Sequence, residues 1–168
     1  MKRSESFKLF LSCFPQEKLP ITLSSENASY FSEKNKALPI ELIQRFILQG
    51  LPTDHEDEFT EYIACCRLPV SKDVHAVIYW RGSLMHYAYF LCTYTKNGVL
   101  INREMIAGLS SDGEMVHHSV ATIDEDLIIE RVSGSQSEKD ALYDPVSSKA
   151  VSMEILPSGE IIFSLQEG

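Results

Sequence analysis

The last two thirds of the chain alternates short apolar runs with clusters of turn residues, a pattern typical of consecutive β-strands. Gly, Pro, Asn and Asp occupy most of the connections, and residues 133–148 form the longest polar interruption. Because the other connections are short, neighbouring strands should run antiparallel as a meander. We expect strands near residues 62–68, 74–80, 85–95, 99–107, 115–123, 127–132, 150–156 and 160–165.

Asn97-Gly98 lies between two of these apolar runs, which is the strongest short-range signal for a β-hairpin. A two-residue turn would pair Lys96 with Val99 and fix the register of both strands. One face of the hairpin is then the more apolar, and we expect it to meet the core beneath a helix. That face carries the pairs Phe90–Met105, Cys92–Arg103 and Tyr94–Ile101.

The N-terminal third predicts one helix, at residues 39–49. Apolar residues recur there at helical spacing, Pro39 suits the first helical position, and Gly50 suits the end. Apolar positions between residues 7 and 13 alternate with mostly polar ones, so we expect a short strand or extended arm there. Residues 15–36 are polar, with apolar anchors at 21–23 and 30–31, and predict a surface loop with at most one brief strand.

These elements predict a single α+β domain over residues 1–168. It comprises an extended arm and loop at 1–36, a helix within 37–50, and an antiparallel meander over 60–166. The sheet should be strongly twisted or partly closed, with the one helix packed on a face.

Charge and cysteine content narrow the functional classes. The net charge of −9 argues against binding nucleic acid through its phosphates and against docking on anionic lipid. No apolar run approaches the 18 residues that a membrane-spanning helix needs. The four cysteines lack zinc-site spacing and predict free thiols in a reducing compartment. We therefore expect a cytoplasmic protein, or an exported one if a signal segment has been removed.

The aromatic centre of the sequence offers the first candidate contacts. Tyr87 and Tyr89 belong either to the packed core or to a partly exposed groove for a small apolar ligand or a protein partner. Arg103 is the one charge on the apolar face of the hairpin. It either lies at the sheet margin, where it snorkels to solvent or pairs with a carboxylate, or it is available to a ligand.

The histidines offer a second candidate. His75 and His86 lie on neighbouring predicted strands around the turn at 81–83, where cross-strand contact with a carboxylate would resemble a metal site. The adjacent pair His117-His118 should point to opposite faces of its strand.

The acidic run 54–58 lacks the glycine and alternating ligands of a calcium loop and predicts a solvated loop. The sequence contains no nucleophile elbow or phosphate-binding loop, so no catalytic residue, metal or cofactor is assigned.

Three segments carry a resemblance: YTKNGVLI (94–101), ATIDEDLII (121–129) and LPSGEII (156–162). They resemble hairpins of uncharacterised bacterial proteins built as antiparallel meanders, some of them exported or lipid-anchored. The resemblance implies a sheet-rich fold and supplies no catalytic residue.

Together these observations favour a non-enzymatic binding or protein-interaction module. The alternative is a metal-dependent or hydrolytic enzyme that uses a histidine and carboxylate cluster formed in three dimensions. A homodimer that pairs exposed strand edges is a third hypothesis.

Overall fold

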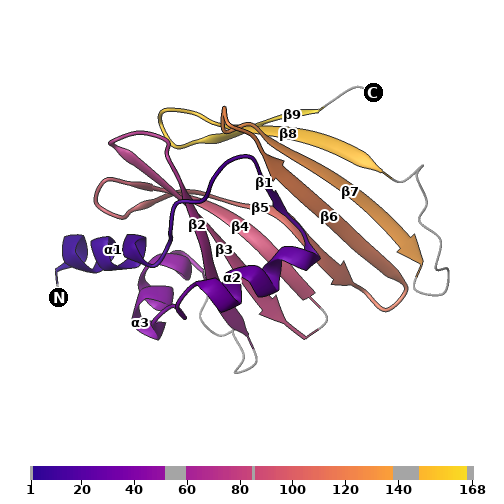
Figure 1. Ribbon diagram of the computed structural model, residues 1–168, viewed down its shortest axis with the longest axis horizontal. Coiled ribbons are helices and arrows are strands. Elements are labelled where there is room, and N and C mark those ends of the chain that lie inside the picture. The colour runs from indigo at the N-terminus through magenta and orange to yellow at the C-terminus, as the bar shows by residue number, and fades with distance from the viewer. Residues whose placement is uncertain (1, 52–59, 85, 138–147, 166–168) are drawn as a thin grey trace.

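The computed structural model describes residues 2–51, 60–84, 86–137 and 148–165. These residues form one antiparallel sheet in the order β2-β3-β4-β5-β6-β7-β8-β9, with β1 paired beside β6 (Figure 1). The predicted fold class, an antiparallel meander with a smaller helical part, is confirmed. The strands are β1 (Ile21–Leu23), β2 (Glu61–Leu68), β3 (Val74–Ser83), β4 (His86–Thr95), β5 (Leu100–Ser111), β6 (Met115–Ile123), β7 (Ile129–Ser137), β8 (Lys149–Ile155) and β9 (Ile161–Leu165).

All eight predicted strands are present as β2–β9, and β1 is the brief strand expected near residue 22. Three strands are longer than predicted: β3 continues to Ser83 through the predicted turn at 81–83, β5 continues to Ser111 and β7 to Ser137. The first part of the predicted loop at 133–148 is therefore strand. The acidic run 54–58 and the remainder of that loop, 138–147, lie outside the described residues.

The N-terminal third is more helical than its sequence pattern predicts. It contains α1 (Arg3–Ser12), a 3-10 turn η1 (Ser25–Asn27), α2 (Ala28–Lys34) and α3 (Ile40–Leu42), which continues as a π-helical turn η2 (Ile43–Ile47). The expected strand at 7–13 is wrong. Phe7, Phe10, Leu11 and Phe14 are all buried and recur at helical spacing, whereas Leu9 is 47% exposed.

The predicted helix at 39–49 is confirmed in part. Pro39 lies one residue before the helix instead of at its first position. From Ile43 onward the helix widens, because the Leu48 amide donates to the Ile43 carbonyl five residues earlier (2.9 Å).

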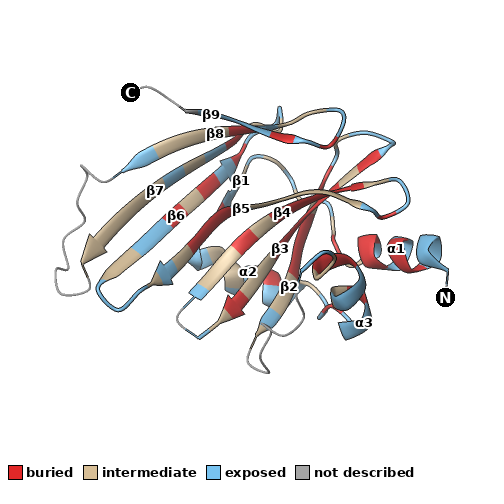
Figure 2. Cartoon of the chain, turned by 180° about the vertical axis from the view of Figure 1, so that it is seen from behind, coloured by how far each residue is buried: buried red, intermediate tan, exposed pale blue. Residues whose placement is uncertain are grey.

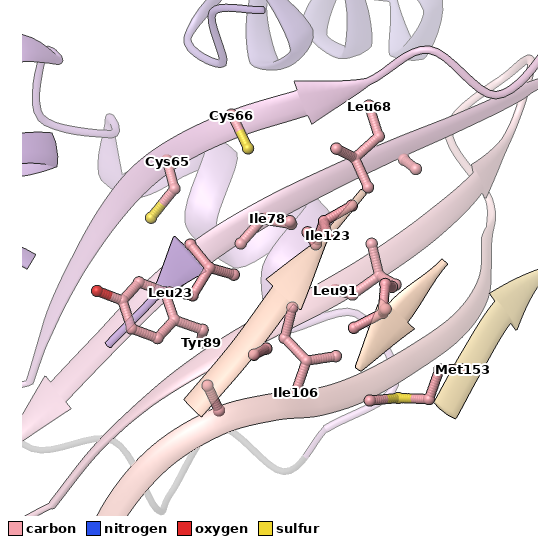
Figure 3. Close-up of a cluster of buried hydrophobic side chains, with 14 of the residues drawn as sticks. Leu23, Cys65, Cys66, Leu68, Ile78, Tyr89, Leu91, Ile106, Ile123 and Met153 are labelled. Atoms are coloured by element: carbon pink, nitrogen blue, oxygen red, sulfur yellow. The ribbon is translucent and has the colours of Figure 1, made fainter. Parts of the chain in front are cut away.

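Strands β2–β4 are covered on both faces, so the prediction of a single core face was incomplete. One face packs against α1, α3 and η2 through residues that include Val77, Tyr79, Cys92 and Tyr94. The other face, which carries Ile78, Tyr89 and Leu91, packs against α2, β1 and strands β6–β9. Figure 3 shows Leu91, Ile106, Ile123 and Met153 gathered in this second cluster. Because successive side chains point to opposite faces, buried strands of this kind are apolar throughout.

The β4–β5 hairpin has the predicted register in its middle: Phe90 pairs with Met105 and Cys92 with Arg103. Near the turn the prediction was wrong, because Tyr94 pairs with Leu100 instead of Ile101. The turn holds three residues, since the Thr95 amide donates to the Val99 carbonyl (2.8 Å). Gly98 supplies the left-handed conformation that closes such a turn, with φ 86°.

The sheet divides between β5 and β6. These strands pair only between Gly108–Ser111 and Val116–Ser119. Further along β6, at residues 121–123, its partner is β1 instead of β5. We call β2–β5 the first leaf and β1 with β6–β9 the second leaf. The leaves are joined at one end, and the apolar cluster of Figure 3 fills the space between them. At the far end, the Thr93 hydroxyl donates to the Gly159 carbonyl and links the leaves (2.6 Å).

Candidate functional site

A groove of about 520 Å³ crosses strands β4–β7 where the two leaves are joined. On β4 it lies on the sheet face that α1 and α3 cover over β2–β4, the face that carries Phe90. Figure 2 shows these helices at one side of the face, with the strands β5–β7 uncovered beyond them. The volume falls in the range of small-molecule sites in proteins. The groove is therefore the strongest candidate site on geometric grounds.

Small side chains form the floor of the groove. Strand register aligns Ala88, Gly108, Ser119 and Ser133 as direct neighbours on four consecutive strands. At about 4.8 Å per strand, this floor is about 14 Å long. Gly108 is required for close packing, because a Cβ there would lie 2.5 Å from the Tyr87 carbonyl oxygen. Arg81 and Lys149 continue the same row at its two ends.

Two rows of longer side chains form the walls. Phe90 and Met105 make an apolar wall on the first leaf, and Arg131 extends it on the second leaf. The Arg131 guanidinium donates to the Met105 carbonyl (2.9 Å) and so bridges the point where β5 and β6 separate. The opposite wall is polar and contains the aligned residues Ser110, His117 and Ser135.

The electrostatics of the groove are opposite to those of the whole chain. Three of the fifteen Lys and Arg residues and three of the five histidines line it: Arg81, Arg131, Lys149, His86, His117 and His118. Among the described residues that line it there is no Asp or Glu, although the chain has 24 of them. A concave surface with cations and hydroxyls but without carboxylates favours an anionic ligand.

Polar groups connect the polar wall to Asp112, which lies outside the groove lining. His117 Nδ1 lies 2.7 Å from the Ser135 hydroxyl, and its Nε2 lies 3.9 Å from a carboxylate oxygen of Asp112. The other Asp112 oxygen accepts the amides of Met115 (2.7 Å) and Glu114 (2.9 Å). These hydrogen bonds lower the pKa of Asp112, so the carboxylate is ionised at neutral pH. The register of β6 and β7 confirms that His117 and His118 lie on opposite faces.

The two candidate tyrosines have different environments in the structure. Tyr89 is fully buried, and its hydroxyl donates to the Ser24 carbonyl (2.7 Å), so it has no surface to offer a ligand. Tyr87 is half-buried, stacks on Trp80 and borders the groove. His86 is exposed and also borders the groove.

Arg103 has a local structural partner. It donates to the Ile47 carbonyl and, over 3.1 Å, to the Gln49 carbonyl, both at the end of the α3–η2 helix. The expected carboxylate partner is therefore replaced by backbone carbonyls, which a cation at a helix C-terminus satisfies well.

His75 and His86 do not meet. In the β3–β4 register His75 pairs with Tyr94 and His86 with Ser83, at opposite ends of the hairpin. Eight residues of extended strand separate these ends by about 27 Å. The hypothesis of a metal site between them is wrong. In the part of the chain that the structure describes, no three His, Cys, Asp or Glu side chains lie close enough to hold a metal ion.

Most residues of the groove floor could not be recognised from sequence. Ala88, Gly108, Ser119 and Ser133 carry no distinctive motif, and only the register of four strands aligns them. No local signal marks them, because Asp and Glu occur between residues 105 and 123 at nearly their frequency in the whole chain.

Comparison with known proteins gives no relative. No family model matches the chain, and neither the curated proteins nor the solved structures contain a significant match. The resemblance to bacterial meander proteins stays a prediction. No helix among the described residues is long and apolar enough to cross a membrane.

Proposed function

We propose that this protein is a binding protein that holds a small-molecule ligand in the groove across β4–β7. The observation that carries the proposal is a concave site of about 520 Å³ with a floor of small residues and walls of contrasting polarity. Such a surface is pre-formed by the register of the sheet, so binding requires little reorganisation.

A mixed fragment library tests this function by two-dimensional ¹⁵N NMR. We expect the fragments that bind to shift the amides of the floor residues Gly108, Ser119 and Ser133. Ser133→Trp should fill the groove and weaken these fragments at least tenfold. Thr122→Trp is the matched control, because Thr122 is exposed on the opposite face of β6 and the same ring there leaves the groove open. Fragments that shift amides elsewhere, or none that bind, would exclude the function.

The Asp112–His117–Ser135 chain supports hydrolysis as a second candidate. His117 could accept the Ser135 proton as the hydroxyl attacks an ester carbonyl, then return a proton to the departing alcohol. Water would release the acyl group by the reverse transfers. The 3.9 Å separation between Asp112 and His117 exceeds a hydrogen bond, so the carboxylate orients the imidazole weakly.

An esterase assay decides this candidate. We expect wild-type protein to hydrolyse p-nitrophenyl butyrate and a fluorophosphonate probe to label Ser135. Ser135→Ala and His117→Gln should abolish both signals, and Ser133→Ala should preserve them. Activity that survives Ser135→Ala, or labelling of another serine, would rule the candidate out.

We also propose that the protein works in a reducing compartment such as the cytoplasm. Cys65, Cys66 and Cys92 are buried free thiols. Burial raises the pKa of Cys66 to about 12 and that of Cys92 to about 11, so little thiolate forms at neutral pH. These thiols support packing instead of redox chemistry, and mass spectrometry of protein from native cells would detect any disulfide.

A further inference from the structure

The two leaves contribute different side chains to the groove, because its apolar lining lies on the first leaf and its second-leaf lining is polar. On the first leaf, Ala88, Phe90 and Met105 present apolar surface, with Arg81, His86 and Ser110 at its margins, and Met105 is 45% exposed. On the second leaf every lining side chain is polar, and Ser133 adjoins both Arg131 and Lys149, with Ser119 on its other side. A ligand that satisfies both linings needs an apolar body and a hydrogen-bonding head.

The charge of the second-leaf lining specifies the head. Ser133 pairs directly with Lys149 across β7 and β8, and Arg131 lies two residues before Ser133 on the same face of β7. The Arg131 guanidinium uses one nitrogen for the Met105 carbonyl, which fixes its position beside the floor. Cations flanking hydroxyl donors are the groups that bind carboxylate, phosphate or sulfate. A cationic head would be repelled, and a neutral head would gain only the hydroxyls.

We infer that the ligand is an amphiphilic anion: one carboxylate, phosphate or sulfate group on a short apolar body. The anionic group binds between Arg131 and Lys149 over Ser133, and the apolar body lies on Phe90 and Met105. This inference rests on the proposed function and adds the chemical class and the orientation of the ligand.

The single-anion class also agrees with the size of the site. The floor is about 14 Å long, which accommodates a head and a chain of about eight carbons. The strongly acidic chain disfavours long polyanions, whose remaining charges would be repelled by a protein of net charge −9.

Three probes with one tail length test the inference: octanoate, octylamine and octyl glucoside, each below its micelle-forming concentration. Binding is followed by calorimetry and by NMR of the Gly108 and Ser133 amides. We expect octanoate to bind at least tenfold more tightly than the other two, and to weaken as salt rises from 0.05 to 0.5 M. Octyl phosphate and octyl sulfate then identify the preferred head.

Variants locate the two ends of the ligand. Lys149 is exposed, so Lys149→Gln should weaken octanoate about three- to fivefold, whereas Arg131→Gln should weaken it about tenfold. Met105→Asn should weaken octanoate more than it weakens acetate. Lys96→Gln, an exposed change in the β4–β5 turn, is the matched charge control and should leave binding unchanged. If Arg131→Gln does not fold, Arg131→Lys replaces it as the test variant, because it keeps the positive charge and removes only the guanidinium.

The outcomes separate this inference from the proposed function. Equal binding of octyl glucoside or octylamine in the groove would overturn the anionic class and leave the groove as a binding site. The inference would also be overturned if octanoate bound without shifting the groove amides. The same holds if Lys149→Gln and Arg131→Gln both left the affinity for octanoate unchanged. If the fragment library finds no ligand for the groove, both proposals fail.

Discussion

At the scale of single residues, two charged side chains stabilise the contact between the helical layer and the sheet. Arg103 extends from β5 to carbonyls at the end of the α3–η2 helix, and Arg3 of α1 donates to the Gly98 carbonyl in the β4–β5 turn (2.9 Å). Each joins segments that are far apart in the sequence. Arg103 is half-buried, so its bonds are screened less than those of a surface pair.

Replacing Arg103 should destabilise the fold. We expect Arg103→Gln to lower the free energy of unfolding by about 1.5–3 kcal/mol, because two carbonyls at a helix end lose a charged donor. Arg103→Lys should recover part of the loss. Urea denaturation measures both, with Lys96→Gln as the exposed control. An Arg103→Gln midpoint equal to that of wild type would refute the capping role.

His75 should make stability depend on pH. Burial, helped by the nearby Arg67 charge, lowers the pKa of His75, whose ring packs against Phe7. The unfolded chain then binds a proton at higher pH than the folded protein does. Stability should therefore fall as pH drops from about 6.5, the ordinary histidine pKa. His75→Gln should flatten this part of the urea-midpoint curve between pH 7.5 and 5.5, whereas the exposed change His86→Gln should not.

At the scale of elements, the strands were predictable because each has a local signature. Apolar runs bounded by turn residues identify β2–β9, and Asn97-Gly98 sets the register of β4 with β5 over four residue pairs. Helix α1 was missed because residues 7–13 fit both a period of two and a helical period. Packing against η2 selects the helix, as the contact between Phe10 and Phe46 shows (ring centroids 5.1 Å apart).

The candidate site was less predictable than the strands. Tyr87 and His86 were chosen from sequence and do border the groove, whereas Arg103 and His75 belong to other contacts. The floor depends on register across four strands, and that register is set by a bulge in β5 that no local pattern shows.

Substitutions at two turn glycines, Gly98 and Gly113, can distinguish the cost of backbone strain from the cost of lost packing. Gly98 and Gly113 both have positive φ, 86° and 94°. A Cβ at Gly98 would lie 2.8 Å from the Phe7 ring, whereas a Cβ at Gly113 meets nothing within 4 Å. We expect Gly113→Ala to cost about 1 kcal/mol from strain alone. Gly98→Ala should cost about 1–3 kcal/mol more, because the turn packs against α1. Equal losses in urea denaturation would contradict this packing.

At the scale of the whole molecule, the two leaves share one apolar cluster and have few polar links at their open end. Thr93 of β4 donates to Gly159, and the Asn102 side chain of β5 accepts the Ile161 amide (3.1 Å). Both links hold the β8–β9 hairpin on the first leaf. Separation of the leaves would expose this apolar cluster to water. The two hydrogen bonds therefore help to keep buried a much larger apolar surface than the groups that form them.

Removing the Thr93 link should loosen the second leaf selectively. Thr93 is fully buried, and Thr93→Val keeps its shape but leaves the Gly159 carbonyl unpaired, at a cost of about 1–3 kcal/mol. Hydrogen exchange should accelerate in β8 and β9 more than in β2 and β3. Uniform acceleration across both leaves would instead indicate that the molecule opens as one unit.

The insertion of β1 beside β6 has a consequence for how the chain acquires its structure. Ile21 pairs with Ile123, about a hundred residues later in the chain, so this pairing closes a very long loop. Hairpins such as β4–β5 need only a few residues between their strands and can form first. Pairing of β1 with β6 should then be among the last steps, and it should limit the folding rate to that of proteins with high contact order.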